Sequence, residues 1–149
     1  KDLSSLLESK KYFKIVIDEY PNTDFSLDAK FKLALINSIL ASKELYIGKY
    51  YLSQKKWIPA MNRFKSIITE YENTEYVEEA LHRLVEVNYY LGLKSEAKKY
   101  AVLLGYNYQS SDWYKESYRV FNKKYENPRD KIKKDKQSFI IKKFKNLFK

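Results

Sequence analysis

The sequence contains no cysteine and only three glycines, three prolines and one histidine in 149 residues. Without cysteine, disulfide scaffolds, cysteine-ligated zinc and thiol catalysis are excluded. The single histidine, His82, removes most zinc sites and most acid–base schemes that depend on histidine. The scarcity of glycine and proline argues against collagen-like, linker-like or turn-rich all-β chains. No apolar run approaches about 18 residues, so the sequence predicts no membrane-spanning helix.

What the sequence does contain is an apolar fraction of 44% and a formal net charge of +10. The charge is uneven, because residues 129–149 hold nine basic and two acidic residues and residues 1–128 carry a net charge of only +3. We therefore expect a nearly balanced globular body at 1–128 and a basic C-terminal segment at 129–149. Because the chain starts at Lys1 and shows no signal segment, we expect a processed protein or a fragment.

An internal repeat organises the body. Residues 13–29 and 64–80 align without gaps at an offset of 51, with eight identities in seventeen positions. In the second copy Phe64, Ile67, Ile68 and Tyr71 follow the i, i+3, i+4, i+7 spacing of one helix face. The repeated unit is therefore predicted to be helical, and duplicated helical units are typical of solenoids.

The periodicity predicts an all-α chain. The expected helices cover approximately residues 3–20, 24–54, 57–71, 75–91, 94–104, 110–126 and 130–148, and the longest of them has a candidate break near Ala41-Ser42. Thr74 or its neighbour is expected to cap the helix that follows it. Glu75, Glu78 and Glu79 then lie at that helix start, where the helix dipole favours anions, and this explanation is preferred over a metal site.

The spacing of small and aromatic residues favours one repeat type. Gly48, Tyr51, Trp57, Ala60 and Phe64 stand at the signature spacings of the 34-residue tetratricopeptide (TPR) pattern. The glycine and the alanine let two helices approach closely, and the aromatic rings fill the space beside their crossing. The predicted fold class is an all-α, TPR-like α-solenoid of about three helical hairpins, followed by a basic C-terminal helix.

More specific residues indicate a family. Tyr50-Tyr51, Trp57, Ala60, Asn62-Arg63 and the Tyr-x-Asn-Thr turn at 71–74 resemble the BamD family, also called ComL or YfiO. Its members are lipoproteins of the outer-membrane β-barrel assembly (Bam) machinery. The resemblance covers roughly residues 10–125 and corresponds to the C-terminal part of such a protein.

The resemblance implies a non-enzymatic scaffold subunit of the Bam complex at the periplasmic face of the outer membrane. It would need no cofactor or metal and would bind the periplasmic domains of the barrel-forming subunit BamA, alongside other Bam lipoproteins. Association with the membrane would use an N-terminal lipid anchor absent from this chain. Asn62 and Arg63 match the family's Asn-Arg pair and are the candidate partner-binding residues, since arginine pairs bidentately with carboxylates.

The basic segment has no match in the family, so its role depends on its own residues. On a helix, apolar residues from Ile140 to Phe148 share one face, and lysines occupy much of the remainder. Such a helix can cap the repeat array, lie on an anionic membrane or dock in a partner groove. Lys142, Lys143, Phe144 and Phe148 are the candidate contacts in the last two cases.

Two further alternatives stay open at the level of the sequence. A generic TPR adaptor for extended peptides fits the same fold. Nucleic-acid binding through the basic segment is disfavoured, because no recognition motif accompanies the charge. His82, a lone histidine near Glu78 and Glu79 on a predicted helix, is expected on the surface rather than in a metal or catalytic site.

Overall fold

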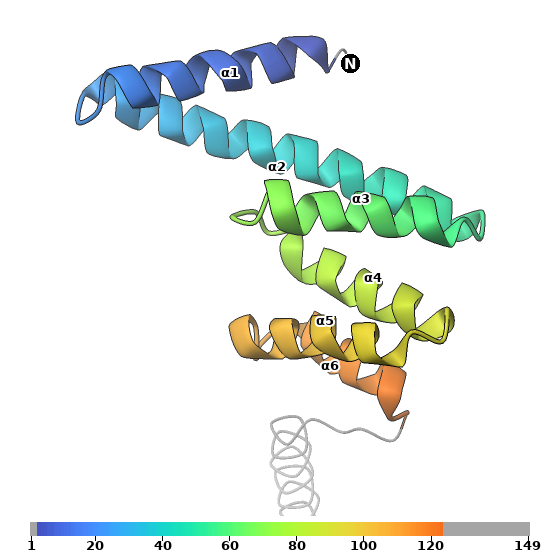
Figure 1. The fold of residues 1–149 in the computed structure, drawn as a ribbon. Coiled ribbons are helices and arrows are strands. Elements are labelled where there is room, and N and C mark those ends of the chain that lie inside the picture. The colour runs from blue at the N-terminus through green and yellow to red at the C-terminus, as the bar shows by residue number, and fades with distance from the viewer. Residues whose placement is uncertain (1–2, 124–149) are drawn as a thin grey trace, which may run out of the picture.

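A computed structural model describes residues 3–123 of the chain. Within this range the chain forms only α-helices, with no strand: α1 (Ser4–Glu19), α2 (Asp24–Ser53), α3 (Trp57–Glu70), α4 (Val77–Tyr90), α5 (Lys94–Asn107) and α6 (Asp112–Phe121). Each helix runs back along its predecessor, and α6 also packs against α4 (Figure 1). The predicted all-α, TPR-like solenoid is confirmed.

The helix boundaries agree with the prediction within a few residues, with one clear exception. The candidate break near Ala41-Ser42 is wrong, because α2 continues through both residues. Ala41 is fully buried and the Ser42 hydroxyl donates to the carbonyl of Ile39 at 2.8 Å, so the serine is satisfied within the helix and does not interrupt it. The predicted helix at 130–148 lies outside the described residues.

The crossing of α2 and α3 depends on one small residue. Gly48 faces the ring of Phe64, which is completely buried, and a Cβ atom at Gly48 would lie 2.5 Å from the ring carbon Cε1. Ala60 is also fully buried in α3. These contacts confirm that Gly48 and Ala60 permit the close approach predicted from the TPR spacing, with Phe64 filling the space beside them.

The duplicated turns after α1 and α3 share a side-chain hydrogen bond, but the helix that follows starts differently in the two cases. Thr23 and Thr74 each donate a side-chain hydrogen bond to the tyrosine carbonyl three residues earlier, at 2.8 Å. Thr23 then caps α2 by accepting from the backbone of Ser26 at 3.2 Å. Thr74 does not cap α4, which starts only at Val77 and has no side-chain cap. The expected cap at Thr74 is therefore wrong, because extra residues separate the threonine from the helix.

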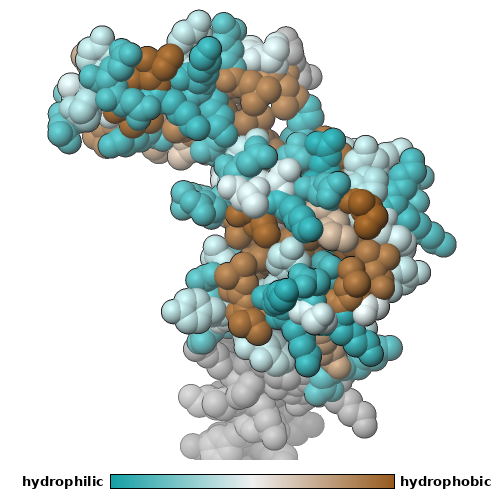
Figure 2. Space-filling view, in the orientation of Figure 1, coloured by the Kyte–Doolittle hydropathy of each residue, from teal (hydrophilic) through white to brown (hydrophobic). Residues whose placement is uncertain are grey.

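The main core lies between residues 36–45 of α2 and helices α3 to α5. In contrast, α1 contains no buried residue, and Phe25 and Phe31 on α2 are 78% and 76% exposed. Apolar side chains accordingly appear on the surface of the α1–α2 hairpin, and others lie over α3 to α5 (Figure 2). No helix within residues 3–123 has the length and apolar character needed to cross a membrane.

Candidate protein-binding surface

Arg63 projects from α3 towards α2 and is fixed there by Glu44. One guanidinium nitrogen, Nη1, donates to both carboxylate oxygens, at 3.2 Å to Oε1 and 3.1 Å to Oε2. The Arg63 side chain is still 41% exposed, whereas that of Glu44 is 19% exposed. The hydrogen bond to Glu44 and the attraction of its charge raise the pKa of Arg63 above its ordinary value. Arg63 is thus a permanently charged donor held in one position.

A shallow groove of about 370 Å³ adjoins this ion pair. Its walls come from the end of α2 and from α3, and the lining residues are Tyr51, Ile58, Pro59, Asn62, Arg63 and Ser66. Asn62 and Ile58 are exposed, and Asn62 directly precedes Arg63 in the sequence. The groove therefore combines an apolar wall with neutral and charged polar groups, as the binding surfaces of proteins commonly do. The structure brings the predicted residues Asn62 and Arg63 together there.

Glu44 explains one departure from the TPR pattern. It stands where that pattern usually has its first tryptophan, and in this chain the position carries a carboxylate that anchors Arg63 across the α2–α3 hairpin. Replacing a packed ring by an ion pair makes this part of the hairpin surface polar. Because the pair is partly exposed, its contribution to stability is small, about 0–1 kcal/mol. Its larger effect is to hold the guanidinium in place.

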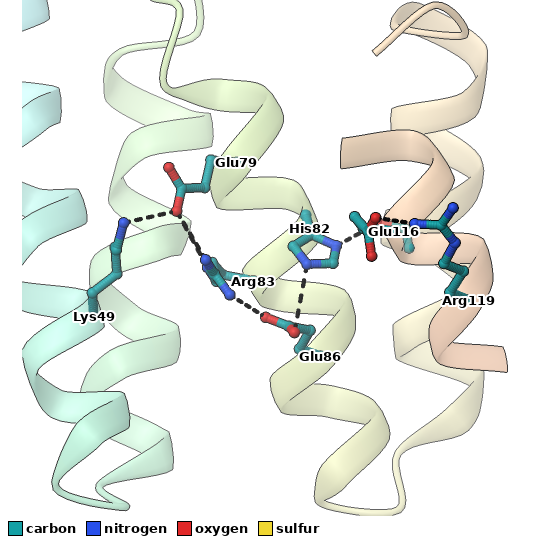
Figure 3. A network of polar contacts seen from close by, with 8 residues as sticks. Lys49, Glu79, His82, Arg83, Glu86, Glu116 and Arg119 are labelled. Carbon is teal, nitrogen blue, oxygen red and sulfur yellow. Dashed lines mark hydrogen bonds and ion pairs between the residues drawn. The ribbon is translucent and has the colours of Figure 1, made fainter. Parts of the chain in front are cut away.

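A second polar network links α2, α4 and α6 (Figure 3). Glu79 accepts from Lys49 at 3.1 Å and from Arg83 at 3.1 Å, and Arg83 also donates to Glu86 at 2.7 Å. The Arg83 guanidinium lies 5.3 Å from the centre of the Trp113 ring. The network continues from Glu86 to His82, whose Nε2 lies 3.5 Å from Oε1 of the carboxylate.

His82 is buried, which corrects the expectation that it lies on the surface. Its exposure is 4%, its Nδ1 lies 2.9 Å from the hydroxyl oxygen of Ser117, and its ring lies 5.2 Å from that of Trp113. The reason is tertiary, because α6 covers the face of α4 that carries the histidine. An imidazole in this position connects two helices and is not exposed to a ligand.

The network also lowers one pKa. Partial burial by itself would raise the pKa of Glu86, but the hydrogen bonds and charges of His82 and Arg83 outweigh that effect and lower the pKa to about 2. This network was not identified from the sequence, although Glu79, Arg83 and Glu86 stand at the i, i+4 and i, i+3 spacings of paired helix charges. No comparable sequence pattern indicated that Ser117 and Trp113 take part in the network.

Glu78 and Glu79 lie in the first turn of α4, as the dipole argument predicted, and Glu75 lies just before it. Within the described part of the chain, no group of three or more His, Asp or Glu residues is placed to hold a metal ion. The candidate contacts Lys142, Lys143, Phe144 and Phe148 lie outside the described residues.

Comparisons with known proteins match the sequence of the chain to one family. A family model described as YfiO, outer membrane lipoprotein, matches residues 1–103. The chain belongs to this family. It is 46% identical to the outer membrane protein assembly factor BamD of Rickettsia prowazekii, over 85% of the chain and 50% of the relative. It is 37% identical to the BamD of Caulobacter vibrioides, over 82% of the chain and 40% of that relative.

A further relative, the BamD of Xylella fastidiosa, is 29% identical over 77% of the chain and 39% of its own length. The chain therefore spans about half the length, or less, of the curated relatives it matches. The family assignment confirms the resemblance read from Asn62-Arg63 and the Tyr-x-Asn-Thr turns.

Proposed function

We propose that the chain is a scaffold in the assembly of outer-membrane proteins and binds a protein partner through the groove beside Arg63. The proposed partner is the periplasmic part of the barrel-forming subunit BamA, on the periplasmic side of the outer membrane. The proposed role is binding rather than catalysis. The observation that carries the proposal is the partly exposed Arg63, held by Glu44 next to Asn62 and the apolar wall of Ile58.

The geometry supports recognition of a carboxylate on the partner. Glu44 occupies Nη1 of Arg63 from one side, and the exposed remainder of the guanidinium can donate to a second carboxylate. A fixed guanidinium loses little side-chain entropy on binding, which favours affinity. The names of the relatives, assembly factors of outer membrane proteins, supply the biological setting.

Binding of the full chain to purified BamA periplasmic domains tests the proposal. We expect Arg63→Glu to weaken binding by at least about tenfold, because it replaces a donor with a charge that repels the partner carboxylate. Calorimetric titration of wild-type and variant chains measures the change. If the variant binds with wild-type affinity, Arg63 is not a contact and the proposal is wrong.

A matched variant separates the direct contact of Arg63 with the partner from the support that Glu44 gives to Arg63. Glu44→Gln removes the internal anion but keeps a side-chain oxygen that can still accept a hydrogen bond from Arg63 and hold it, so we expect binding to fall by less than about threefold. Arg119→Glu serves as a control on a different face, because Arg119 is an exposed arginine that pairs with Glu116 on α6. Equal loss in the three variants would indicate a general charge effect and would contradict a specific role for the Arg63 groove.

A further inference from the structure

The two ends of the helical stack differ in charge. The turns α1–α2, α3–α4 and α5–α6 lie at one end, and the turns α2–α3 and α4–α5 lie at the other (Figure 1). Residues 18–24, 70–76 and 108–112 at the first end contain no basic residue, and their acidic residues are Asp18, Glu19, Asp24, Glu70, Glu72, Glu75 and Asp112. Residues 50–57 and 88–95 at the second end contain no acidic residue.

We call the second end the lysine end and define it by Lys55, Lys56, Tyr90, Leu91, Leu93 and Lys94. These six residues are all exposed. None of the three lysines forms an ion pair with another described residue, and Lys94 lies 5.9 Å from the centre of the Tyr89 ring. The lysine end therefore presents cations that no side chain of the described part neutralises.

The two turns at this end are built in the same way. In each, the chain leaves its helix through one residue with positive φ, Lys55 at 56° and Gly92 at 79°. Lys56 donates its backbone N–H to Tyr51 and Leu93 donates to Asn88, both at 2.9 Å, which closes a Schellman-type helix end. These hydrogen bonds end both helices in the same way and place Lys55, Lys56 and Leu93 outside them.

An aromatic contact joins the two turns. The rings of Trp57 and Tyr90 lie 4.3 Å apart, although the residues belong to different hairpins. Tyr90 is nevertheless 68% exposed, and Leu91 and Leu93 beside it are 36% and 47% exposed. Aromatic and aliphatic side chains among lysines are the combination found where proteins contact the interface of a lipid bilayer.

From these observations we propose that the lysine end is a docking surface for an anionic phospholipid membrane. The three lysines would attract the lipid headgroups, and Tyr90, Leu91 and Leu93 would enter the interfacial region. The acidic end would be repelled, so the stack would meet the bilayer in one orientation. This inference uses residues separate from Arg63 and does not depend on the proposed binding to BamA.

A basic segment follows α6 in the sequence, and its charge has the same sign as that of the lysine end. Helix α6 ends at Phe121, on the same side of the stack as the lysine end (Figure 1). The sequence then leads into residues 129–149, with a net charge of +7. In the sequence, the segment that follows α6 thus carries charge of the same sign as Lys55, Lys56 and Lys94.

Co-sedimentation of the full chain with vesicles tests the proposal. The vesicles consist of phosphatidylcholine with or without phosphatidylglycerol. Each lysine near an anionic surface changes affinity by about fivefold, so we expect Lys55→Gln/Lys56→Gln/Lys94→Gln to weaken binding to the anionic vesicles by roughly 100-fold. The matched control Lys14→Gln/Lys43→Gln/Lys65→Gln makes the same charge change at exposed positions elsewhere and should weaken binding by less than about fivefold.

A fluorescent probe tests which end meets the lipid. Because the chain has no cysteine, Leu93→Cys and Asn73→Cys each allow one environment-sensitive dye to be attached, at the lysine end and at the acidic end respectively. We expect the emission of the dye at position 93 to shift to the blue with anionic vesicles and that of the dye at position 73 to stay unchanged. Arg63→Glu should bind vesicles as the wild type does.

Three outcomes would overturn the proposal. The first is an absence of binding to anionic vesicles. The second is an equal effect of the two lysine triples, which would indicate non-specific attraction. The third is binding that survives the change at the lysine end but disappears when the lysines at 142, 143 and 145 are changed to glutamine, which would assign the attraction to the basic segment alone.

Discussion

The two copies of the repeat are similar in sequence but differ in their surroundings. Phe64 is completely buried, whereas Phe13 at the equivalent position is only partly buried. Tyr71 is 8% exposed and Tyr20 is 57% exposed. The second copy lies between neighbouring helices on both sides, while α1 packs mainly against α2 and reaches the end of α3 through Lys10, whose Nζ lies 4.7 Å from the centre of the Tyr71 ring. A repeat pattern thus specifies the local helix and turn, whereas the neighbouring helices determine how much the apolar residues of the repeat contribute to the stability of the fold.

The largest difference between the copies should appear at the two phenylalanines. Phe64→Ala removes a fully buried ring and should lower the free energy of unfolding by about 3–5 kcal/mol. Phe13→Ala should lower it by only about 1–2 kcal/mol, because the ring already contacts solvent. Urea denaturation of the full chain measures both values. Similar losses in the two variants would show that the α1–α2 hairpin is as well packed as the second copy.

A smaller difference is expected at Asn37 and Asn88, which lie beyond the two aligned stretches but at the same offset of 51. Asn88 is buried and its side-chain nitrogen donates to the carbonyl of Leu84 at 2.7 Å, so Asn88→Ala should destabilise by about 1–2 kcal/mol. The oxygen Oδ1 of Asn37 is enclosed but accepts no hydrogen bond within the described residues. Asn37→Ala should therefore change stability by less than about 0.5 kcal/mol. A larger loss at Asn37 than at Asn88 would contradict this assignment.

The polar network makes the second copy sensitive to acid, and the first copy has nothing equivalent, since Leu35 aligns with Glu86. The folded-state pKa of Glu86 is about 2, below its ordinary value of 4.5. A lowered carboxyl pKa stabilises the fold above the ordinary pKa, and this contribution is lost as the pH falls from about 4.5 through about 2. Because the carboxylate is partly exposed, screening limits the contribution to about 1 kcal/mol.

We expect Glu86→Gln to remove this part of the acid dependence. The free energy of unfolding, measured between pH 6 and pH 2, should fall by about 1 kcal/mol more for the wild type than for the variant. Glu8→Gln on α1 is a suitable control, since Glu8 is exposed and makes no ion pair with a described residue. Parallel curves for the wild type and Glu86→Gln would show that Glu86 is not the group responsible.

The smallest expected difference concerns the backbone of the two Tyr-x-Asn-Thr turns. Asn22 has a φ of 65°, whereas the aligned Asn73 does not have positive φ. Asn22→Gly should stabilise the chain by a few tenths of a kcal/mol, because glycine adopts this conformation without a steric cost. Asn73→Gly should instead destabilise slightly, through greater freedom of the unfolded chain. Thermal denaturation with a precision of about 1 °C can detect the opposite signs.

Much of the fold could be predicted because its signals are local. The i, i+3, i+4, i+7 spacing beginning at Phe64 marked a helix, and Gly48 with Ala60 marked a close crossing. The candidate site was predictable only in part. Asn62 and Arg63 were identified through the family resemblance, but the anchoring of Arg63 by Glu44 joins residues nineteen positions apart on two helices. A pattern within one helix carries no information on such a pair.

The helical repeat, the short turns and the family are all encoded in the sequence, because helix periodicity, turn residues and signature spacings act over a few neighbouring positions. The packing of the helices is what buries His82 under α6, joins two turns through Trp57 and Tyr90, and separates charge between the two ends of the stack. The physical reason is that burial and electrostatic grouping depend on which helices lie side by side. Stacking alternates the direction of successive helices, so turns distant in the sequence meet at the same end.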